Sequence, residues 1–148
     1  RLCYTRRLEF GLSQHELAET ASLSVDVVRR IETAGGKNGS TIGLVLSYLS
    51  GLGLKLEMVM SLKNITYVLS PEENDVSGSR MACKFSETCR SLADISRRDL
   101  NQRIKKPIGF VWKIESVVTK FTNGPTLGSL GEIARACSVT VELRTRNK

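Results

Sequence analysis

The sequence is poor in the residue types that most catalytic and metal sites use. Its 148 residues include one histidine, His15, and four cysteines that lie far apart, with no C-x-x-C pair. Zinc and thiol redox motifs need closely spaced cysteine and histidine ligands. We therefore expect free thiols, no metal and no cofactor. His15 has no evident nucleophile or carboxylate partner, and no glycine-rich phosphate loop occurs, so the sequence argues against an enzyme.

Long apolar runs are also missing. No stretch of roughly 18 apolar residues occurs, and the N-terminus lacks the basic, apolar and small-residue order of a secretory signal. A soluble, cytoplasmic protein without a membrane partner is the expectation. The chain begins at Arg1 rather than at methionine, so we expect residues upstream of it. Its length suits one average domain or two very small ones.

Acidic residues are scarce toward the C-terminus. The formal net charge is +7. Residues 1–60 carry 7 basic and 6 acidic groups, residues 61–78 carry 1 and 3, and residues 79–148 carry 14 and 6. The positive surplus therefore belongs to the last segment. Such a local field favours a polyanion, either nucleic acid or an anionic membrane surface.

The chain contains an internal repeat. A shift of 83 positions brings identical residues together at Thr5/Thr88, Arg7/Arg90, Ser13/Ser96, Leu17/Leu100, Val28/Val111, Ile31/Ile114 and Glu32/Glu115. From Asn38 onward a shift of 85 positions does the same at Asn38/Asn123, Gly39/Gly124, Thr41/Thr126, Gly43/Gly128 and Glu57/Glu142. The two-residue difference falls between Ala34 and Thr122, in a segment where a loop absorbs length at little cost. The sequence predicts two copies of one unit, over 1–60 and 79–148, joined by a linker over 61–78.

Each copy is expected to form four short helices and a strand. In the first copy the helices are expected over 2–10, from a Ser13 cap, from a Ser24 cap to Glu32, and from Thr41 to about Gly51. Ser13 and Glu16 have the spacing of a capping box. Only residues 22–24 separate the second helix from the third, which is the spacing of a helix-turn-helix. The alternation over 54–58 predicts a half-buried strand.

The second copy follows the same plan. Its helices are expected over about 80–93, from Ser96 with Asp99, with Pro107 in the first turn of the third, and from Thr126, before a strand over 139–143. Proline loses no hydrogen bond in a first helical turn. The linker holds a β-like stretch at 65–69 and then a polar tract. The predicted fold class is mainly α: two tandem helix-turn-helix domains, each followed by a short β-strand.

The first copy resembles the lambda-repressor/Cro (XRE-type) DNA-binding family. The resemblance rests on residues 6–19, which read Arg-Arg-Leu-Glu-Phe-Gly-Leu-Ser-Gln-His-Glu-Leu-Ala-Glu, and on Leu23-Ser24 and Val28-Arg29-Arg30-Ile31-Glu32. In the second copy, residues 105–115 resemble the family variant G-K-P-Q-S-F-V-S-K-I-E, and residues 124–127 resemble the opening of its fourth helix. The strand after the fourth helix is similar to that of antitoxins that partner HipA-type kinases and of HigA-like antitoxins, where it serves dimerisation.

The resemblance implies which residues of the first copy contact DNA. In that family the second helix crosses the DNA backbone and the third lies in the major groove. The matching positions are Gln14, Ser24, Val25, Asp26, Val27, Arg29 and Arg30. Val28 and Ile31 repeat unchanged and are expected in the core. Asp26 would repel phosphates unless it accepts from cytosine or pairs with Arg30 one turn on.

The second copy departs from the family at its reading positions. Ile108, Gly109 and Trp112 stand where the variant has polar residues, so hydrogen-bonded base readout is reduced. Basic side chains are expected around this helix: Arg97, Arg98, Arg103, Lys105, Lys106 and Lys113. The combination predicts phosphate gripping rather than base reading. The alternative is that Ile108, Phe110 and Trp112 form a protein-protein patch.

The two predicted strands are expected to mediate assembly, because an open strand edge is a liability unless paired. Their apolar faces consist of Leu54, Leu56, Met58, Val139, Val141 and Leu143. They could pair within one chain, as an intramolecular pseudo-dimer, or across a two-fold axis in a homodimer. The predicted function is a sequence-specific transcription regulator that binds double-stranded DNA. The alternative is an antitoxin or anti-activator whose main partner is another protein.

Overall fold

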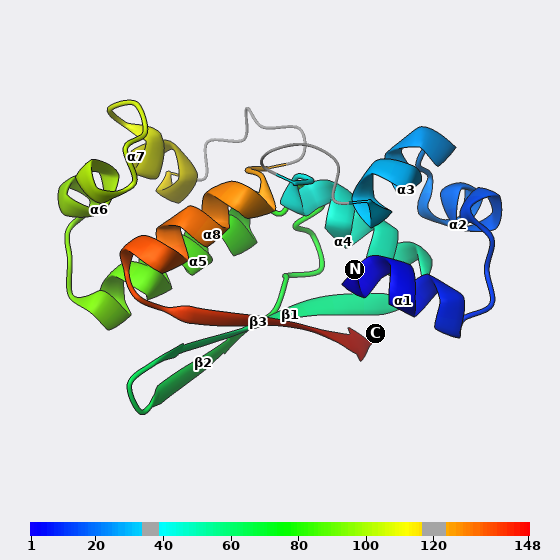
Figure 1. The fold of residues 1–148 in the computed structure, drawn as a ribbon, viewed down its shortest axis with the longest axis horizontal. Coiled ribbons are helices and arrows are strands. Elements are labelled where there is room, and N and C mark those ends of the chain that lie inside the picture. Colours follow the sequence, from blue (N-terminus) through cyan, green and yellow to red (C-terminus); the bar gives the residue numbers. More distant parts are fainter. Residues whose placement is uncertain (34–38, 117–123) are drawn as a thin grey trace.

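A computed structural model describes three stretches of the chain, residues 1–33, 39–116 and 124–148. These stretches form eight helices and a three-stranded antiparallel sheet, with 53% helix and 18% strand. The helices gather on one side of the sheet (Figure 1). The protein is mixed α/β, so the predicted fold class, mainly α with two tandem helix-turn-helix domains, is wrong. The strand expected for each copy is present, but the two strands join with a third strand in one sheet.

Four helices form the first half of the molecule: α1 (Leu2–Glu9), α2 (Gln14–Ala21), α3 (Val25–Glu32) and α4 (Ile42–Gly51). The predicted capping box is confirmed, since Ser13 Oγ accepts from the Glu16 amide at 3.2 Å and Glu16 Oε2 accepts from the Ser13 amide at 2.7 Å. The Ser24 cap is confirmed too, because its hydroxyl accepts from the Val27 amide at 3.2 Å. These contacts set where α2 and α3 begin.

Four more helices form the second half: α5 (Ser79–Ala93), α6 (Arg97–Arg103), α7 (Phe110–Glu115) and α8 (Leu127–Ala136). The predicted caps at Ser96 and Thr126 are confirmed, with side chains that accept from the Asp99 and Ser129 amides. The loops expected to absorb the length difference between the copies include 34–38 and 117–123, which lie outside the described residues.

Helix α7 does not begin where the sequence predicted. Pro107 was expected in its first turn, but the helix starts three residues later, at Phe110, and Gly109 precedes it with a left-handed φ of 87°. The Asn101 side chain explains the late start. Its amide nitrogen donates to the Lys106 and Pro107 carbonyls, and its oxygen accepts from the Val111 amide. These bonds hold residues 104–109 as a turn, so the connection between α6 and α7 is longer than that between α2 and α3.

Strand β1 (Leu54–Leu62) lies at the centre of the sheet, with β2 (Ile65–Leu69) on one side and β3 (Thr140–Asn147) on the other. Both pairings are antiparallel, from Met58↔Leu69 to Leu62↔Ile65 and from Leu54↔Asn147 to Ser61↔Thr140. The β-like stretch predicted in the linker is confirmed as β2. The predicted strand over 139–143 was too short, because pairing with β1 keeps the polar residues 144–147 extended.

The two halves are related by a pseudo-two-fold axis. Residues that correspond under the shift of 85 positions pair with each other, Met58 with Leu143 in the sheet and Thr41 with Thr126 in an isolated bridge. Two equivalent hydrogen bonds flank that bridge, from the Ile42 amide to the Pro125 carbonyl and from the Leu127 amide to the Ser40 carbonyl, each 2.9 Å long. A contact in which each partner offers the same residues is the signature of two-fold symmetry. One chain thus contains an arrangement that two identical subunits would otherwise make.

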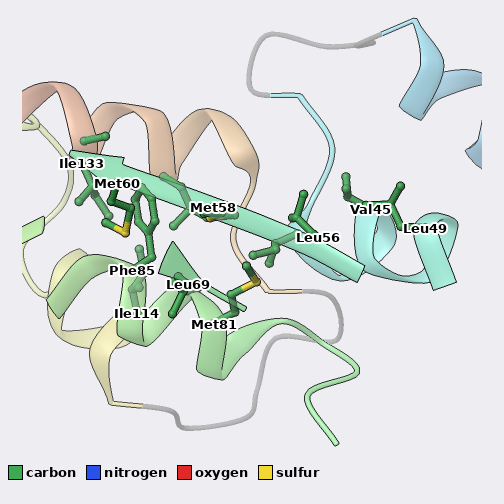
Figure 2. Packing of buried hydrophobic residues seen from close by; sticks show 14 of the residues in the cluster. Val45, Leu49, Leu56, Met58, Met60, Leu69, Met81, Phe85, Ile114 and Ile133 are labelled. Atoms are coloured by element: carbon green, nitrogen blue, oxygen red, sulfur yellow. The ribbon is translucent and has the colours of Figure 1, made fainter. Parts of the chain in front are cut away.

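A continuous core joins the halves through the inner face of β1. Leu56 lies near Val45 and Leu49 of α4, while Met58 and Met60 point toward the side of Phe85 and Ile133 (Figure 2). The predicted core residues Val28 and Ile31 are confirmed, with 0% and 6% exposed surface. The apolar face predicted for the second strand is wrong at its end. Val139 is buried, but Leu143 is 38% exposed because β3 is an edge strand.

Candidate nucleic-acid interface

Helix α3 presents a polar face to solvent. Four of the predicted contact residues are exposed: Ser24, Asp26, Arg29 and Arg30. Val25 and Val27 are half-buried and pack against the core cluster. Asp26 does not pair with Arg30, which was one of the two alternatives for this acid, because its carboxylate lies 3.5 Å from the Arg29 guanidinium instead. No ion pair of Arg30 occurs among the described residues. Arg30 is thus the cation of α3 with a charge left for an external partner.

A buried acid anchors the end of this helix. The Glu32 side chain, 3% exposed, accepts from Arg7 Nε at 2.5 Å and from Arg7 Nη2 at 3.0 Å. Tyr48 Oη donates to the same carboxylate at 2.5 Å. Burial raises the pKa of Glu32, and the hydrogen bonds from Arg7, Tyr48 and Gln14 lower it by more, so the carboxyl stays below its ordinary pKa. The fully bonded pair fixes α3 against α1 and α4.

Gln14 connects the buried Glu32 carboxylate to the exposed Arg29 side chain. Its Nε2 donates to Glu32 Oε2 at 2.9 Å, and its Oε1 accepts from Arg29 Nε at 3.4 Å. The half-buried amide thereby lies between the buried acid and an exposed cation. Gln14 at the start of α2 and Arg29 on α3 are held in one orientation before any ligand arrives, which lowers the ordering cost of binding.

The second half contains an ion pair equivalent to Arg7–Glu32, with different neighbours. Arg90 Nη2 lies 2.7 Å from the Glu115 carboxylate, whose side chain is 1% exposed. These residues correspond to Arg7 and Glu32 under the shift of 83 positions. Arg97 takes the place of Gln14 and approaches the same carboxylate at 4.0 Å. A second cation thus stands at the surface of the second half where the first half has a neutral amide.

The residues before and on α7 differ most from the first half. Ile108, predicted to face DNA from a helix, lies in the preceding turn and is 100% exposed. Gly109 is also outside the helix, so α7 lacks the first two residues that α3 has. Trp112 is on the helix and 56% exposed. The prediction that Ile108 and Gly109 belong to the third helix of the second copy is therefore wrong.

The basic residues of the second half form two groups rather than one. Arg97, Arg98 and Lys113 are exposed on α6 and α7. Arg103, Lys105 and Lys106 instead line a hollow together with Glu132 and Arg135 of α8. Arg103 donates to the Ala136 carbonyl at 3.2 Å, and Lys106 lies 3.6 Å from Glu132. The second group thus neutralises the C-terminal end of α8 as well as adding charge.

The predicted assembly residues lie at the contact between the halves. Leu54, Leu56 and Met58 are buried on β1, and each pairs with a residue of β3. Val141 is half-buried opposite Met60, while Val139 precedes β3. The strands of the two copies therefore pair antiparallel within the chain.

Sequence reasoning missed four residues that shape this surface: Arg7, Tyr48, Asn101 and Glu115. The repeat itself contained a signal for two of them, because Arg7/Arg90 and Glu32/Glu115 are identical charged pairs in both copies. Identical charges at matching positions in a divergent repeat indicate a buried pair. Nothing local marks Asn101 or Tyr48.

The surface carries no sign of metal chemistry within the described stretches. No group of three His, Cys, Asp or Glu side chains there could hold a metal ion, and the four cysteines are buried and free. Nor do the described residues include a helix long and apolar enough to cross a membrane. Comparison of the chain with protein-family models, curated proteins and solved structures finds no match.

Proposed function

We propose that this protein is a cytoplasmic transcription regulator that binds double-stranded DNA, with α3 as its base-reading element. The observation that carries the proposal is the placement of α3 and α7. Both lie on the side of the molecule away from the sheet (Figure 1), at either side of the pseudo-two-fold axis, and each ends in a buried Arg–Glu pair. Two helices placed in this way suit successive major grooves, which lie about 34 Å apart on one face of a duplex.

The two halves are proposed to contribute differently. Arg30 has the donor geometry for paired contacts with guanine, and the preset Gln14 and Arg29 side chains suit the phosphate and base edge beside it. Arg97, Arg98 and Lys113 in the second half supply charge without a polar reading helix. Such contacts position a protein on DNA and add affinity for every sequence. An operator for one chain would therefore contain two unlike half-sites.

DNA binding by the purified chain tests this proposal. A labelled duplex from the region upstream of its own gene is titrated by fluorescence anisotropy at several salt concentrations, beside a scrambled duplex of equal length. We expect tighter binding to the upstream duplex and affinity that falls steeply with salt. Footprinting should show protection over two successive turns. Equal, weak binding to both duplexes would contradict the proposal.

A second candidate function rests on the exposed apolar side chains near α7. Ile108 is fully exposed and Trp112 is 56% exposed, at positions that would otherwise read bases. Clustered exposed apolar residues mark protein interaction sites. In this candidate the protein is an antitoxin or anti-activator whose main partner is another protein. Tight co-purification with the product of a neighbouring gene, lost in Ile108→Ser with Trp112→Ser, together with no preference for upstream DNA, favours it over the first.

A further inference from the structure

The two edges of the sheet differ in how they are protected. Strand β3 carries Glu142, Arg144 and Arg146, and charged side chains discourage pairing with another strand. Strand β2 reads Ile-Thr-Tyr-Val-Leu and has no charge. Three of its apolar side chains are exposed: Ile65 at 60%, Tyr67 at 50% and Val68 at 51%. Charged side chains thus protect the β3 edge against further pairing, and the β2 edge has no such protection.

The backbone of β2 has hydrogen-bonding groups to offer at this open edge. Lys63 and Asn64 form a two-residue turn, with Lys63 at a left-handed φ of 55°, so Leu62 and Ile65 form the closing hydrogen-bonded pair. Hydrogen-bonded and non-hydrogen-bonded pairs alternate along an antiparallel ladder. The amide and carbonyl groups of Thr66 and Val68 therefore point away from β1. Within the described residues no other strand pairs with them.

We propose that β2 binds β2 of a second copy of this chain, antiparallel and centred on Tyr67. In this register Tyr67 lies opposite the partner's Tyr67, Ile65 opposite the partner's Leu69, and Thr66 opposite the partner's Val68. Uncharged side chains meet along the whole strand, and Ile65 and Leu69 form apolar pairs at its two ends. Aromatic and β-branched cross-strand pairs of this kind stabilise antiparallel sheets. The outward amide and carbonyl groups of Thr66 and Val68 are paired by the same contact.

Charge complementarity favours a second copy over another partner. The pairing brings Lys63, at one end of β2, beside the segment that follows β2 in the partner, which contains the exposed Glu73. Neither residue makes an ion pair within its own chain among the described residues. The contact occurs twice across the two-fold axis. Two copies with a net charge of +7 each can thus meet at an uncharged strand flanked by opposite charges.

The pairing also fixes how the copies face. Extending a sheet by antiparallel pairing places the two-fold axis perpendicular to the sheet, so the helices of both copies lie on the same side. The result is one sheet in the order β3-β1-β2-β2-β1-β3 with α3 and α7 of both copies away from it. This association requires no DNA and stands independently of the proposed function.

Mass in solution tests the proposal. We expect the full chain, across a concentration series, to approach twice its mass of 16.3 kDa by sedimentation equilibrium. Val68→Lys should shift it to a single chain, while Val76→Lys, which makes the same change at a 77% exposed position outside the sheet, should not. A far-UV circular dichroism spectrum of Val68→Lys that matches the wild type shows that the fold is intact. A wild-type chain that stays monomeric, or a dimer that survives Val68→Lys, overturns the proposal.

A charge exchange provides a second test that leaves β2 unaltered. Lys63→Glu should weaken the dimer, because position 63 lies beside the partner segment that contains Glu73. Adding Glu73→Lys in the same chain should restore the dimer at least in part. Weakening by Lys63→Glu without recovery in the double variant would mean that these residues do not meet, and the register centred on Tyr67 would be wrong.

Discussion

At the scale of single residues, the buried carboxylate of Glu32 connects the core to the surface. It accepts from the Arg7 guanidinium, the Tyr48 hydroxyl and the Gln14 amide, and Gln14 in turn accepts from Arg29. Removing one partner of a buried ion pair leaves the other charged and uncompensated. Glu32 therefore stabilises the fold and orients the proposed contact residues through one carboxylate.

Glu32→Gln should cost about 3–5 kcal/mol in free energy of unfolding, because Arg7 remains buried without its counter-ion. Urea unfolding of the two proteins measures the difference. Glu9→Gln is the matched control. It breaks an exposed ion pair between Arg6 and Glu9 of α1 and should change stability by less than about 1 kcal/mol. Similar losses in both variants would contradict a special role for Glu32.

The same residue predicts a pH dependence. The folded-state pKa of Glu32 lies below its ordinary value of 4.5, so the folded chain binds fewer protons than the unfolded chain around that pH. Its contribution to stability is present above 4.5 and is lost as pH falls through the lower folded pKa. Wild-type stability should therefore decline more steeply below this value than that of Glu32→Gln. Parallel curves for the two proteins would exclude this contribution.

The proposed division of labour can be separated by single substitutions. Arg30→Ala should reduce the preference for upstream over scrambled DNA by about 1–3 kcal/mol, because it removes the proposed base contact. Arg98→Ala should weaken binding to both duplexes alike and reduce the salt slope by about one. Lys55→Ala, on the sheet and away from α3, is the control and should change neither. An equal loss of preference in Arg30→Ala and Arg98→Ala would refute the division.

At the scale of elements, the connection between α6 and α7 shows how one side chain relocates a helix start. Asn101 stands where the first half has Ala18, and its amide bonds the carbonyls of Lys106 and Pro107. Those carbonyls would otherwise accept bonds from the first turn of a helix that began at Pro107. Gly109 then adopts a φ of 87°, which side chains rarely tolerate. The second half consequently has a shorter third helix.

Asn101→Ala should lower the free energy of unfolding by about 1–3 kcal/mol, because the Val111 amide and the Lys106 carbonyl lose their partner. Trp112, one residue beyond, reports on the change through its fluorescence. Gln102→Ala alters the exposed neighbour and should have little effect. Equal stability of Asn101→Ala and Gln102→Ala would show that the turn holds without this side chain.

At the scale of the whole molecule, the central strand makes the two halves one cooperative structure. Leu56 is fully buried on the inner face of β1, the strand that pairs with β3 and lies against helices of both halves. A single core rather than two small ones also suits the length of the chain, since very small domains bury too little surface to be stable alone.

Leu56→Asp should abolish folding of both halves together, because it places an unpaired charge in the shared core. Far-UV circular dichroism reports all helices, whereas Trp112 fluorescence reports the second half alone. We expect both signals to be lost in Leu56→Asp and to fall together in wild-type unfolding. Val141→Asp, half-buried on the edge strand, should be milder. A second half that stays folded in Leu56→Asp would show that the halves are independent.

What the sequence could predict had a common physical basis. The capping box at Ser13, the caps at Ser24, Ser96 and Thr126, and the repeat with its core residues Val28 and Ile31 all follow from contacts within one turn or from periodicity. Such interactions act between near neighbours in the chain, so they can be predicted from the sequence alone. The composition of residues 65–69 likewise predicted a strand.

The tertiary structure alone decided which segments meet. Nothing near Arg144 predicts that it continues a strand, because its extended conformation comes from pairing with Glu57, far away in the chain. The late start of α7 depends on a side chain nine residues before Phe110. Mixed α/β architecture, the pseudo-two-fold axis and the open edge of β2 all follow from the central position of β1. Long-range pairing is set by the burial and hydrogen bonding of the whole chain, and local sequence does not encode it.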